Sequence, residues 1–187
     1  MTTHSRINVF RKKFVKLFWL SGRLTLGNLW AARFAGVRFG ENCRFYTWNW
    51  GSEPWLVELG ERVTVTQGVS FITHDGAASL VRDDSGRRFR FGKIRVGSDV
   101  FIGVNAIILP GVEIGDRCIV GAGSVVTKSV PAGSIVGGAP ARVIGKFDEF
   151  ELRALSELPS ARDVSVDKNS GYRAWVESAI KAQGERK

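Results

Sequence analysis

The chain has 187 residues, enough for one domain with an appendage at one or both ends but too few for two stable domains. Its hydrophobic fraction of 44% and charged fraction of 24% lie near the averages of globular proteins, which excludes wholesale disorder and insertion into a membrane by many spans. The net charge of +9 is concentrated at the start, because residues 1–45 carry nine Lys and Arg against a single acid, Glu41.

Residues 1–36 predict a basic amphipathic helical segment. Its apolar side chains recur at three- and four-residue spacings, the pattern of one apolar stripe on a helix. They are Val9, Phe10, Phe14, Leu17, Phe18, Trp19 and Leu20. The stripe either packs on the protein itself or lets residues 7–30 make a peripheral contact with the inner face of a membrane. A spanning helix is disfavoured, because the apolar run is shorter than about 20 residues and contains Lys16 and Arg23.

Cysteine usage favours a cytoplasmic address. Cys43 and Cys118 are the only two cysteines, and they have neither metal-ligand spacing nor the pattern of a disulfide framework. We expect Cys118 to be an inert core residue, and the sequence predicts no metal site.

An aromatic stretch occupies residues 45–55 and contains Trp48, Trp50 and Trp55. Flat aromatic faces suit the apolar faces of sugar rings, so these three side chains are candidates for binding a saccharide. The alternative is that they pack against the end of the protein core, since aromatic side chains usually serve burial. The sequence leaves both interpretations open.

A six-residue repeat dominates the second half of the chain. From Val96 it divides without a gap into nine units, and glycine takes the second position in six of them. The first positions are mostly β-branched: Val96, Ile102, Ile108, Ile114, Val120, Val126, Ala132, Gly138 and Ile144. The same register occurs upstream at Leu59, Val65 and Phe71, with a weaker beginning in residues 37–45.

The repeat predicts a triangular prism spanning residues 37–147. If each unit is one short strand and a corner, three units close a coil, and the stacked coils enclose the first-position side chains. Phe71 and Val96 are 25 residues apart, which is not a multiple of six, so a polar and basic loop at residues 77–93 must leave the prism. Residues 148–187 predict helices that cap its open end.

Three segments carry a resemblance to the hexapeptide-repeat acyltransferases, in the branch that contains maltose, galactoside and polysaccharide O-acetyltransferases. They are ITHD (72–75), IRVGSDVFIGVNAIILPGVEIGD (94–116) and VGAGSVVTKSVPAGSIVGGAPARVIGK (120–146). The resemblance covers residues 37–147. It implies an all-β core formed by a left-handed parallel β-helix with helices at both ends, a homotrimer, and acetyl-CoA as donor substrate.

His74 is the candidate catalytic base. Transfer of an acetyl group to a hydroxyl needs a group that removes the hydroxyl proton, and histidine, with an ordinary pKa of ~6.5, suits this task. His74 is the only histidine in the body of the chain, and the resemblance places a catalytic histidine beside an extended loop. Its orienting partner is open: a backbone carbonyl, Glu58 or Asp83 are candidates, whereas Asp75 is expected to serve the turn. The other interpretation of His74 is a histidine that caps a corner.

The resemblance also implies a groove between two subunits that holds the donor. By their place in the matched segments, Val104 and Ala122 would contact the pantetheine arm through their backbones. Thr127, Lys128 and Arg142 would lie near the nucleotide, where cations pair with phosphate.

The sequence therefore predicts an acetyl-CoA-dependent O-acetyltransferase that acts on a saccharide, by direct transfer with a histidine base. The basic, aromatic beginning and the loop favour a cell-surface polysaccharide or its precursor over a free small sugar. An N-acetyltransferase for an amino sugar, a serine O-acetyltransferase and a non-catalytic saccharide-binding scaffold are the alternatives. A zinc-dependent carbonic anhydrase of the same fold would need three histidines, and nucleic-acid binding lacks a recognition motif.

Overall fold

The structure is a computed structural model, and it describes residues 27–164, 166 and 171–185. These residues belong to two compact units that meet between Ile144 and Gly145. The predicted amphipathic stripe, Val9 to Leu20, lies outside the described residues.

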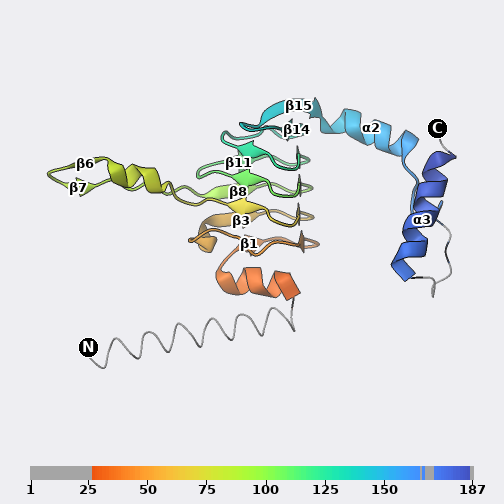
Figure 1. The fold of residues 1–187 in the computed structure, drawn as a ribbon, viewed down its shortest axis with the longest axis horizontal. Coiled ribbons are helices and arrows are strands. Elements are labelled where there is room, and N and C mark those ends of the chain that lie inside the picture. Colours follow the sequence, from red (N-terminus) through yellow and green to blue (C-terminus); the bar gives the residue numbers. More distant parts are fainter. Residues whose placement is uncertain (1–26, 165, 167–170, 186–187) are drawn as a thin grey trace, which may run out of the picture. The chain divides into compact units, whose positions relative to one another are not determined.

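The first unit is a stack of coils, each of which passes through three sheets in turn (Figure 1). The first sheet consists of β1 (Arg38–Phe39), β3 (Val57–Leu59), β8 (Ile94–Val96) and β11 (Glu113–Ile114). The second consists of β2 (Arg44–Phe45), β4 (Thr64–Val65), β9 (Phe101–Ile102), β12 (Ile119–Val120), β14 (Ser134–Gly137) and β15 (Arg142–Lys146). The third consists of β5 (Ser70–Phe71), β10 (Ile107–Ile108) and β13 (Val125–Val126).

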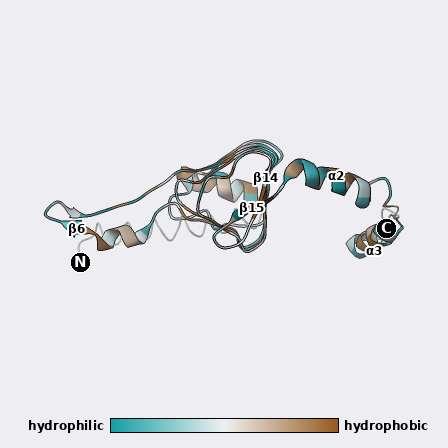
Figure 2. Ribbon diagram, turned by 90° about the horizontal axis from the view of Figure 1, so that it is seen from above, coloured by the Kyte–Doolittle hydropathy of each residue, from teal (hydrophilic) through white to brown (hydrophobic). Residues whose placement is uncertain are grey.

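The register between coils confirms the six-residue repeat. In the middle of the prism each strand pairs in parallel with the strand 18 residues later, so three units make one coil. The pairs are Arg95↔Glu113, Phe101↔Ile119 and Ile107↔Val125. Seen from above, the coils superimpose on one another (Figure 2). The prediction of a parallel β prism is thus confirmed.

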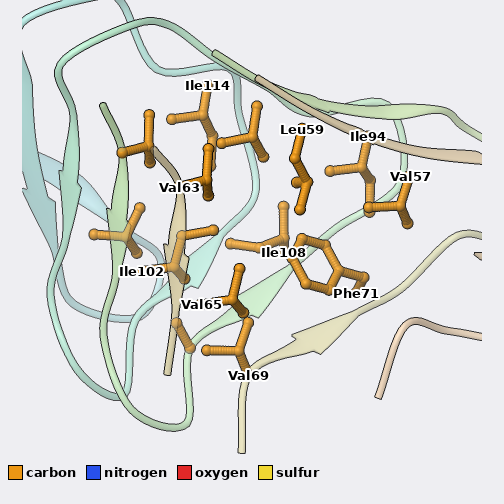
Figure 3. Close-up of a cluster of buried hydrophobic side chains, with 14 of the residues drawn as sticks. Val57, Leu59, Val63, Val65, Val69, Phe71, Ile94, Ile102, Ile108 and Ile114 are labelled. Atoms are coloured by element: carbon orange, nitrogen blue, oxygen red, sulfur yellow. The ribbon is translucent and has the colours of Figure 1, made fainter. Parts of the chain in front are cut away.

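The aliphatic side chains at the first positions form the core. Val96, Ile102, Ile108, Ile114, Val120 and Val126 are all buried, as are Leu59, Val65 and Phe71 in the upstream coils. Figure 3 shows side chains of this cluster gathered in the interior, among them Leu59, Val65, Phe71, Ile102, Ile108 and Ile114. Full burial of one such side chain contributes about 1.5–3 kcal/mol, so the stacked columns are a major source of stability. Cys118 is also fully buried, which confirms it as a core residue.

The repeat register is wrong for the last three units. Ile114 bridges Val130 and Val120 pairs with Val136, so the final coil is two residues shorter than the coils before it. Val130 and Val136 are therefore buried, whereas Ala132, Gly138 and Ile144 are not. The sequence can still be divided into six-residue units after Val126, although the backbone register has already shifted by two residues there.

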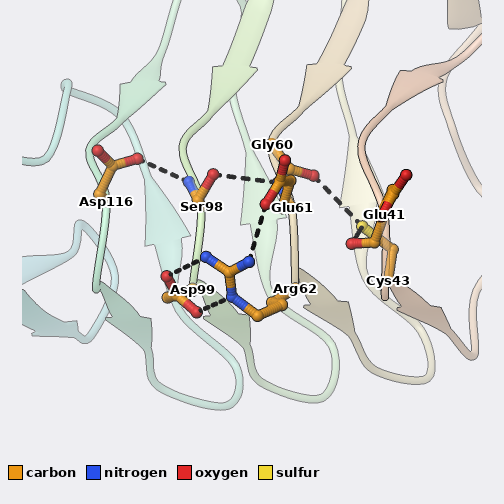
Figure 4. A network of polar contacts seen from close by, with 8 residues as sticks. All are labelled: Glu41, Cys43, Gly60, Glu61, Arg62, Ser98, Asp99 and Asp116. Carbon is orange, nitrogen blue, oxygen red and sulfur yellow. Dashed lines mark hydrogen bonds and ion pairs between the residues drawn. The ribbon is translucent and has the colours of Figure 1, made fainter.

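The corner between the first and second sheets carries a column of residues with left-handed backbone conformation. These residues, one per coil, are Asn42, Arg62, Asp99 and Arg117. Successive corners are joined by side chains, and Arg62 binds Asp99 of the next coil through two hydrogen bonds of 2.6 and 2.9 Å (Figure 4). Ser98 continues the ladder, because its backbone N donates to Asp116 and its hydroxyl accepts from the N of Glu61.

A long excursion leaves the prism between β5 and β8. Here the register between coils is 37 residues rather than 18, as in Thr64↔Phe101. The extra residues form a short 3-10 helix, η2 (Gly76–Leu80), and an antiparallel pair, β6 (Arg82–Asp83) and β7 (Gly86–Arg87). The excursion projects away from the coils in both views (Figures 1 and 2).

Helical residues 27–35 cover the first coil. Ala31 and Ala32 are buried, and the Asn28 side chain donates to the carbonyl of Phe45 at 2.8 Å. The second unit contains α2 (Phe147–Glu157) and α3 (Gly171–Gly184) in the region where the sequence predicts helices. Their capping of the prism stays a prediction. Within the part of the chain that the structure describes, no helix is long and apolar enough to cross a membrane.

We expect Gly103→Ala to destabilise the protein by about 1–3 kcal/mol, the usual scale of overpacking. A Cβ at this corner would lie 2.6 Å from the backbone N of Ala122 and 2.8 Å from the carbonyl O of Val120. The corner cannot retreat easily, because the Gly103 N–H donates to that same carbonyl. Gly76→Ala is the control, since nothing lies within 4 Å of its Cβ position. Denaturant unfolding measures both variants, and equal stabilities would contradict close packing at the corner.

Candidate active site

His74 stands where the excursion leaves the prism. It forms an antiparallel bridge with Phe91, and the flanking bonds run from Gly92 N to Thr73 O and from Asp75 N to Arg90 O, both 2.9 Å. These bonds join the outgoing and returning chain and hold the His74 backbone against the prism. The His74 side chain is 40% exposed, so its ring is accessible to a substrate.

The imidazole of His74 is held by Glu53. The Nδ1 atom of His74 lies 3.0 Å from Oε2 of Glu53, and the Thr73 hydroxyl donates to the same oxygen at 2.6 Å. An ionised carboxylate only accepts hydrogen bonds, so the contact assigns the ring proton to Nδ1. Nε2 then carries a free lone pair and can accept a proton from a substrate.

Hydrogen bonds keep Glu53 ionised. The hydroxyl of Thr73 has the largest effect in lowering the pKa of the Glu53 carboxyl, and the hydrogen bond with His74 lowers it further. Partial burial acts in the opposite direction but does not reverse the shift. At neutral pH the carboxylate therefore orients the imidazole and would stabilise the imidazolium that forms when Nε2 takes up a proton.

The spacing of the first two coils brings Glu53 to His74. Strand pairs in this part of the prism are 20 residues apart, as in Arg38↔Glu58 and Arg44↔Thr64. The same spacing sets Glu53 beneath Thr73. The segment before Glu53 can pass close to Phe71 because residue 51 is glycine. Its φ is +81°, and a Cβ at this position would lie 2.5 Å from the carbonyl O of Phe71.

Sequence reasoning missed Glu53 as the partner of His74. Glu58, one of the expected partners, is engaged with Arg38, and Asp83, the other, pairs with Arg88. Asp75 accepts a hydrogen bond from Ala77 N and caps η2, as expected from its place in the chain. The 20-residue spacing of the first coils was the signal that could have identified Glu53.

A hollow of about 260 Å³ opens beside this pair. The prism and the base of the excursion contribute Glu53, His74, Asp75, Gly76 and Ser79 to its lining. The returning strand of the excursion contributes Arg87, Arg88, Phe89, Arg90 and Phe91. The pair thus has an adjoining space that can receive a small acceptor.

The residues predicted to contact the donor lie at two other places. Val104 and Ala122 are exposed on successive coils at the corner between the second and third sheets, where Gly123 N donates to Val104 O at 2.8 Å. Lys128 and Arg142 line one hollow of about 230 Å³, and Thr127 is exposed next to Lys128. Exposed backbone and a paired cationic hollow fit the amide-rich arm and the phosphates of coenzyme A.

The three tryptophans predicted to bind a sugar have different environments. Trp50 is buried and stacks on Phe71 with a centroid distance of 5.1 Å, so it belongs to the core and offers no face to a sugar. Trp48 and Trp55 are more than half exposed. Trp55 lies in the 3-10 turn η1 (Pro54–Leu56), directly after Glu53.

Comparison with known proteins finds hexapeptide-repeat proteins. A family model described as the hexapeptide repeat of succinyl-transferase matches residues 93–128. Protein CapG of Staphylococcus aureus is 42% identical over 143 residues, which are 75% of this chain and 83% of CapG. The chain belongs to the hexapeptide-repeat acyltransferase family. It is therefore an enzyme that transfers acyl groups.

Other members of this hexapeptide-repeat family match over shorter stretches. Galactoside O-acetyltransferase of Escherichia coli is 32% identical over 97 residues, which are 52% of this chain and 47% of that enzyme. Among solved structures, a maltose O-acetyltransferase of Clostridium difficile has a TM-score of 0.49 at 24% identity. That match covers 62% of this chain and 72% of the other.

We expect Thr73→Val to reduce the acid sensitivity of the fold. A carboxyl whose pKa is lowered by folding adds stability above its unfolded pKa, about 4.3, and this stability is lost as the pH falls through the folded pKa. Without the Thr73 hydroxyl the pKa of Glu53 moves back toward its ordinary value, so less stability depends on pH. Thermal unfolding at pH 7 and at pH 3 measures the difference.

Thr66→Val is the control for this comparison, because the Thr66 hydroxyl donates to the carbonyl of Ile102 and not to a carboxylate. The wild type should lose more stability between the two pH values than Thr73→Val, and as much as Thr66→Val. The same loss in all three proteins would show that the Thr73 contact does not act on Glu53.

Proposed function

We propose that the protein is an acetyl-CoA-dependent O-acetyltransferase whose acceptor is a hydroxyl of a saccharide, either a cell-surface polysaccharide or its precursor. The observation that carries the proposal is the contact between Glu53 and Nδ1 of His74 beside an open hollow. Membership of the acyltransferase family, and the acetyltransferase names of its relatives, support acetyl transfer. A saccharide acceptor follows the galactoside named for one relative and the exposed Trp48 and Trp55.

His74 performs general base and then general acid catalysis. Its Nε2 accepts the proton of the acceptor hydroxyl while the hydroxyl oxygen forms a bond to the thioester carbonyl carbon. As the bond between that carbon and sulfur breaks, the same proton passes from Nε2 to the departing thiolate. Glu53 keeps the Nδ1 proton in place throughout and balances the transient positive charge on the ring. The products are an acetyl ester and a free thiol.

The donor fits two corners of the prism. Val104 and Ala122 would offer backbone groups to the pantetheine arm, and Lys128 and Arg142, with Thr127 beside them, would offer donors to the phosphates. Within one protomer, the third sheet separates the corner of Val104 from the corner where His74 leaves. A donor that contacts both corners must cross this sheet or lie between two copies, which supports a homotrimer with clefts between its subunits.

We infer further features from the family. The coils are expected to be left-handed, as in the resembled enzymes. A cytoplasmic address agrees with two free, buried cysteines, Cys43 and Cys118. Contact of residues 7–30 with the inner face of the membrane stays a proposal, because most of that segment lies outside the described residues.

Removing the base or its partner should lower the rate without unfolding the protein. We expect His74→Ala to lower kcat by roughly 10²-fold or more, the scale of a lost acid-base group, and Glu53→Gln to lower it by about tenfold. Release of free thiol from acetyl-CoA with a panel of oligosaccharides, nucleotide sugars, amino sugars and serine measures the rate.

Glu58→Gln is the matched control, since it makes the same chemical change in a carboxylate that binds Arg38 instead of His74. Unchanged turnover in His74→Ala would remove this residue from the mechanism. Preference for amino acceptors would support N-acetylation. A protein that binds the sugars but does not respond to coenzyme A would be a scaffold.

The donor hollow gives a separate prediction. We expect Lys128→Gln and Arg142→Gln each to raise the KM for acetyl-CoA by about threefold to tenfold, the scale of one charge-assisted hydrogen bond at a partly exposed site, with little change in the KM for the acceptor. Lys181→Gln, on α3, is the control. Steady-state kinetics with each substrate varied in turn makes the measurement. A change confined to the acceptor would contradict a donor role for this hollow.

A further inference from the structure

The hollow beside His74 is unusual in its cations. Three arginines of the returning strand of the excursion, Arg87, Arg88 and Arg90, line a space of about 260 Å³ next to the catalytic pair. A neutral sugar needs hydroxyl and amide partners and an apolar face, but it does not need three guanidinium groups. The charge of this wall therefore calls for an explanation beyond the transfer step.

The three arginines differ in whether an acidic side chain already pairs with them. Arg88 forms an ion pair with Asp83, so its charge is compensated. Arg90 approaches Asp75 only to 4.0 Å, and both side chains are exposed, so this pair contributes little and can exchange for a better anion. Among the described residues Arg87 forms no ion pair. Arg87 and Arg90 are thus the two cations available to a ligand.

Arg87 is held in a geometry suited to an anion. Its guanidinium carbon lies 4.6 Å from the ring centroid of Phe89, over the face of the ring. A guanidinium over a ring face keeps its N–H donors available, and among the described residues none accepts a hydrogen bond from the Arg87 side chain. These donors form a fork that matches two oxygens of a phosphate or a carboxylate.

The aromatic rings supply the neighbouring surface. Phe89 and Phe91 lie nearly parallel, with an interplanar angle of 14° and centroids 6.4 Å apart, and both are more than half exposed. Phe91 also contacts the ring of His74 at a centroid distance of 5.8 Å. An apolar face that leads from the arginines to the base suits a sugar ring whose hydroxyl reaches Nε2.

The acids near the hollow do not cancel this anion site. Glu53 accepts hydrogen bonds from Thr73 and His74, and Asp75 accepts one from Ala77 N, and both carboxylates keep their negative charge. Asp83 forms an ion pair with Arg88. The cations of the lining are therefore gathered on the returning strand, whereas Glu53 lies beside the base, so the negative group of an acceptor would be directed toward Arg87 and Arg90 and away from Glu53.

We infer that Arg87 and Arg90 form an anion subsite for the acceptor, which is a saccharide with a phosphate or carboxylate group next to the ring that is acetylated. The inference rests on the proposed function, because it takes His74 as the base that meets the acceptor. Sites for drug-sized ligands have volumes of about 300–1,000 Å³, and the hollow is smaller. We therefore expect the protein to enclose one charged sugar unit.

Calorimetric titration of the full chain with three probes tests the subsite. The probes are glucose 1-phosphate, glucuronate and glucose, which differ in the anion and share the ring. We expect at least one anionic probe to bind roughly tenfold or more tightly than glucose, and Arg87→Gln and Arg90→Gln to abolish most of that difference. Tighter binding of glucose 1-phosphate identifies phosphate as the recognised group, and tighter binding of glucuronate identifies carboxylate.

Arg82→Gln is the matched control. Arg82 lies in the same excursion but does not line the hollow, and its Nε donates to the carbonyl of Ser79. The affinity of the Arg82→Gln protein for the anionic probes should stay within about twofold of wild type, because an exposed charge away from the ligand contributes little. Equal binding of all three probes to the wild type would overturn the subsite. So would a loss of acetyl-CoA affinity in Arg87→Gln as large as the loss for the anionic probes, since the arginines would then serve the donor.

A parallel assay separates this inference from the proposed function. Thiol release from acetyl-CoA is measured with phosphorylated, uronic acid-containing and neutral oligosaccharides. Turnover that favours the anionic acceptors, with a KM that rises in Arg87→Gln while kcat is kept, supports the subsite. Equal turnover on neutral acceptors supports the proposed function but overturns the subsite. Binding of the anionic probes without thiol release on any acceptor contradicts the proposed function and leaves the anion site standing.

Discussion

The fold depends on one constraint: from β1 to β13, each coil of the prism must hydrogen-bond to the next through strands of only two or three residues. Such short strands cannot hold a register by themselves, so the inward side chains and the corners must hold it. The buried column of Ile102, Val120 and Val65 does this from inside, and the Arg62–Asp99 pair joins successive corners from outside. A residue added within a coil would turn these columns away from the core, and insertions are therefore confined to corners.

The excursion obeys that constraint. It leaves and returns at one corner, between Thr73 and Gly92, and the parallel pairs on either side remain intact. The candidate site forms at this junction. The prism supplies Glu53, and His74 is the residue at which the excursion begins. The returning strand supplies the arginines and phenylalanines of the hollow. The prism and the excursion thus meet at His74.

Much of this arrangement can be predicted from the sequence, because a six-residue period has few structural solutions. The core columns, the break between Phe71 and Val96, and the place of His74 just before the excursion follow from counting. Glu53 was missed because its proximity to His74 depends on a first coil of 20 residues, which shows no repeat. The shift after Val126 was missed because apolar residues continue in a plausible register. Trp50 resembles its exposed neighbours Trp48 and Trp55 in the sequence, and its packing against Phe45 and Phe71 distinguishes it in the structure.

The contact between Glu53 and His74 joins two successive coils. Its length consequently depends on the distance between stacked strands, about 4.8 Å in a β-sheet, and on the bridge to Phe91 at the base of the excursion, but not on the far end of the excursion. The chemistry and the recognition of the acceptor can then evolve separately. A new excursion of different length or charge at the same corner would find Glu53 and His74 already aligned.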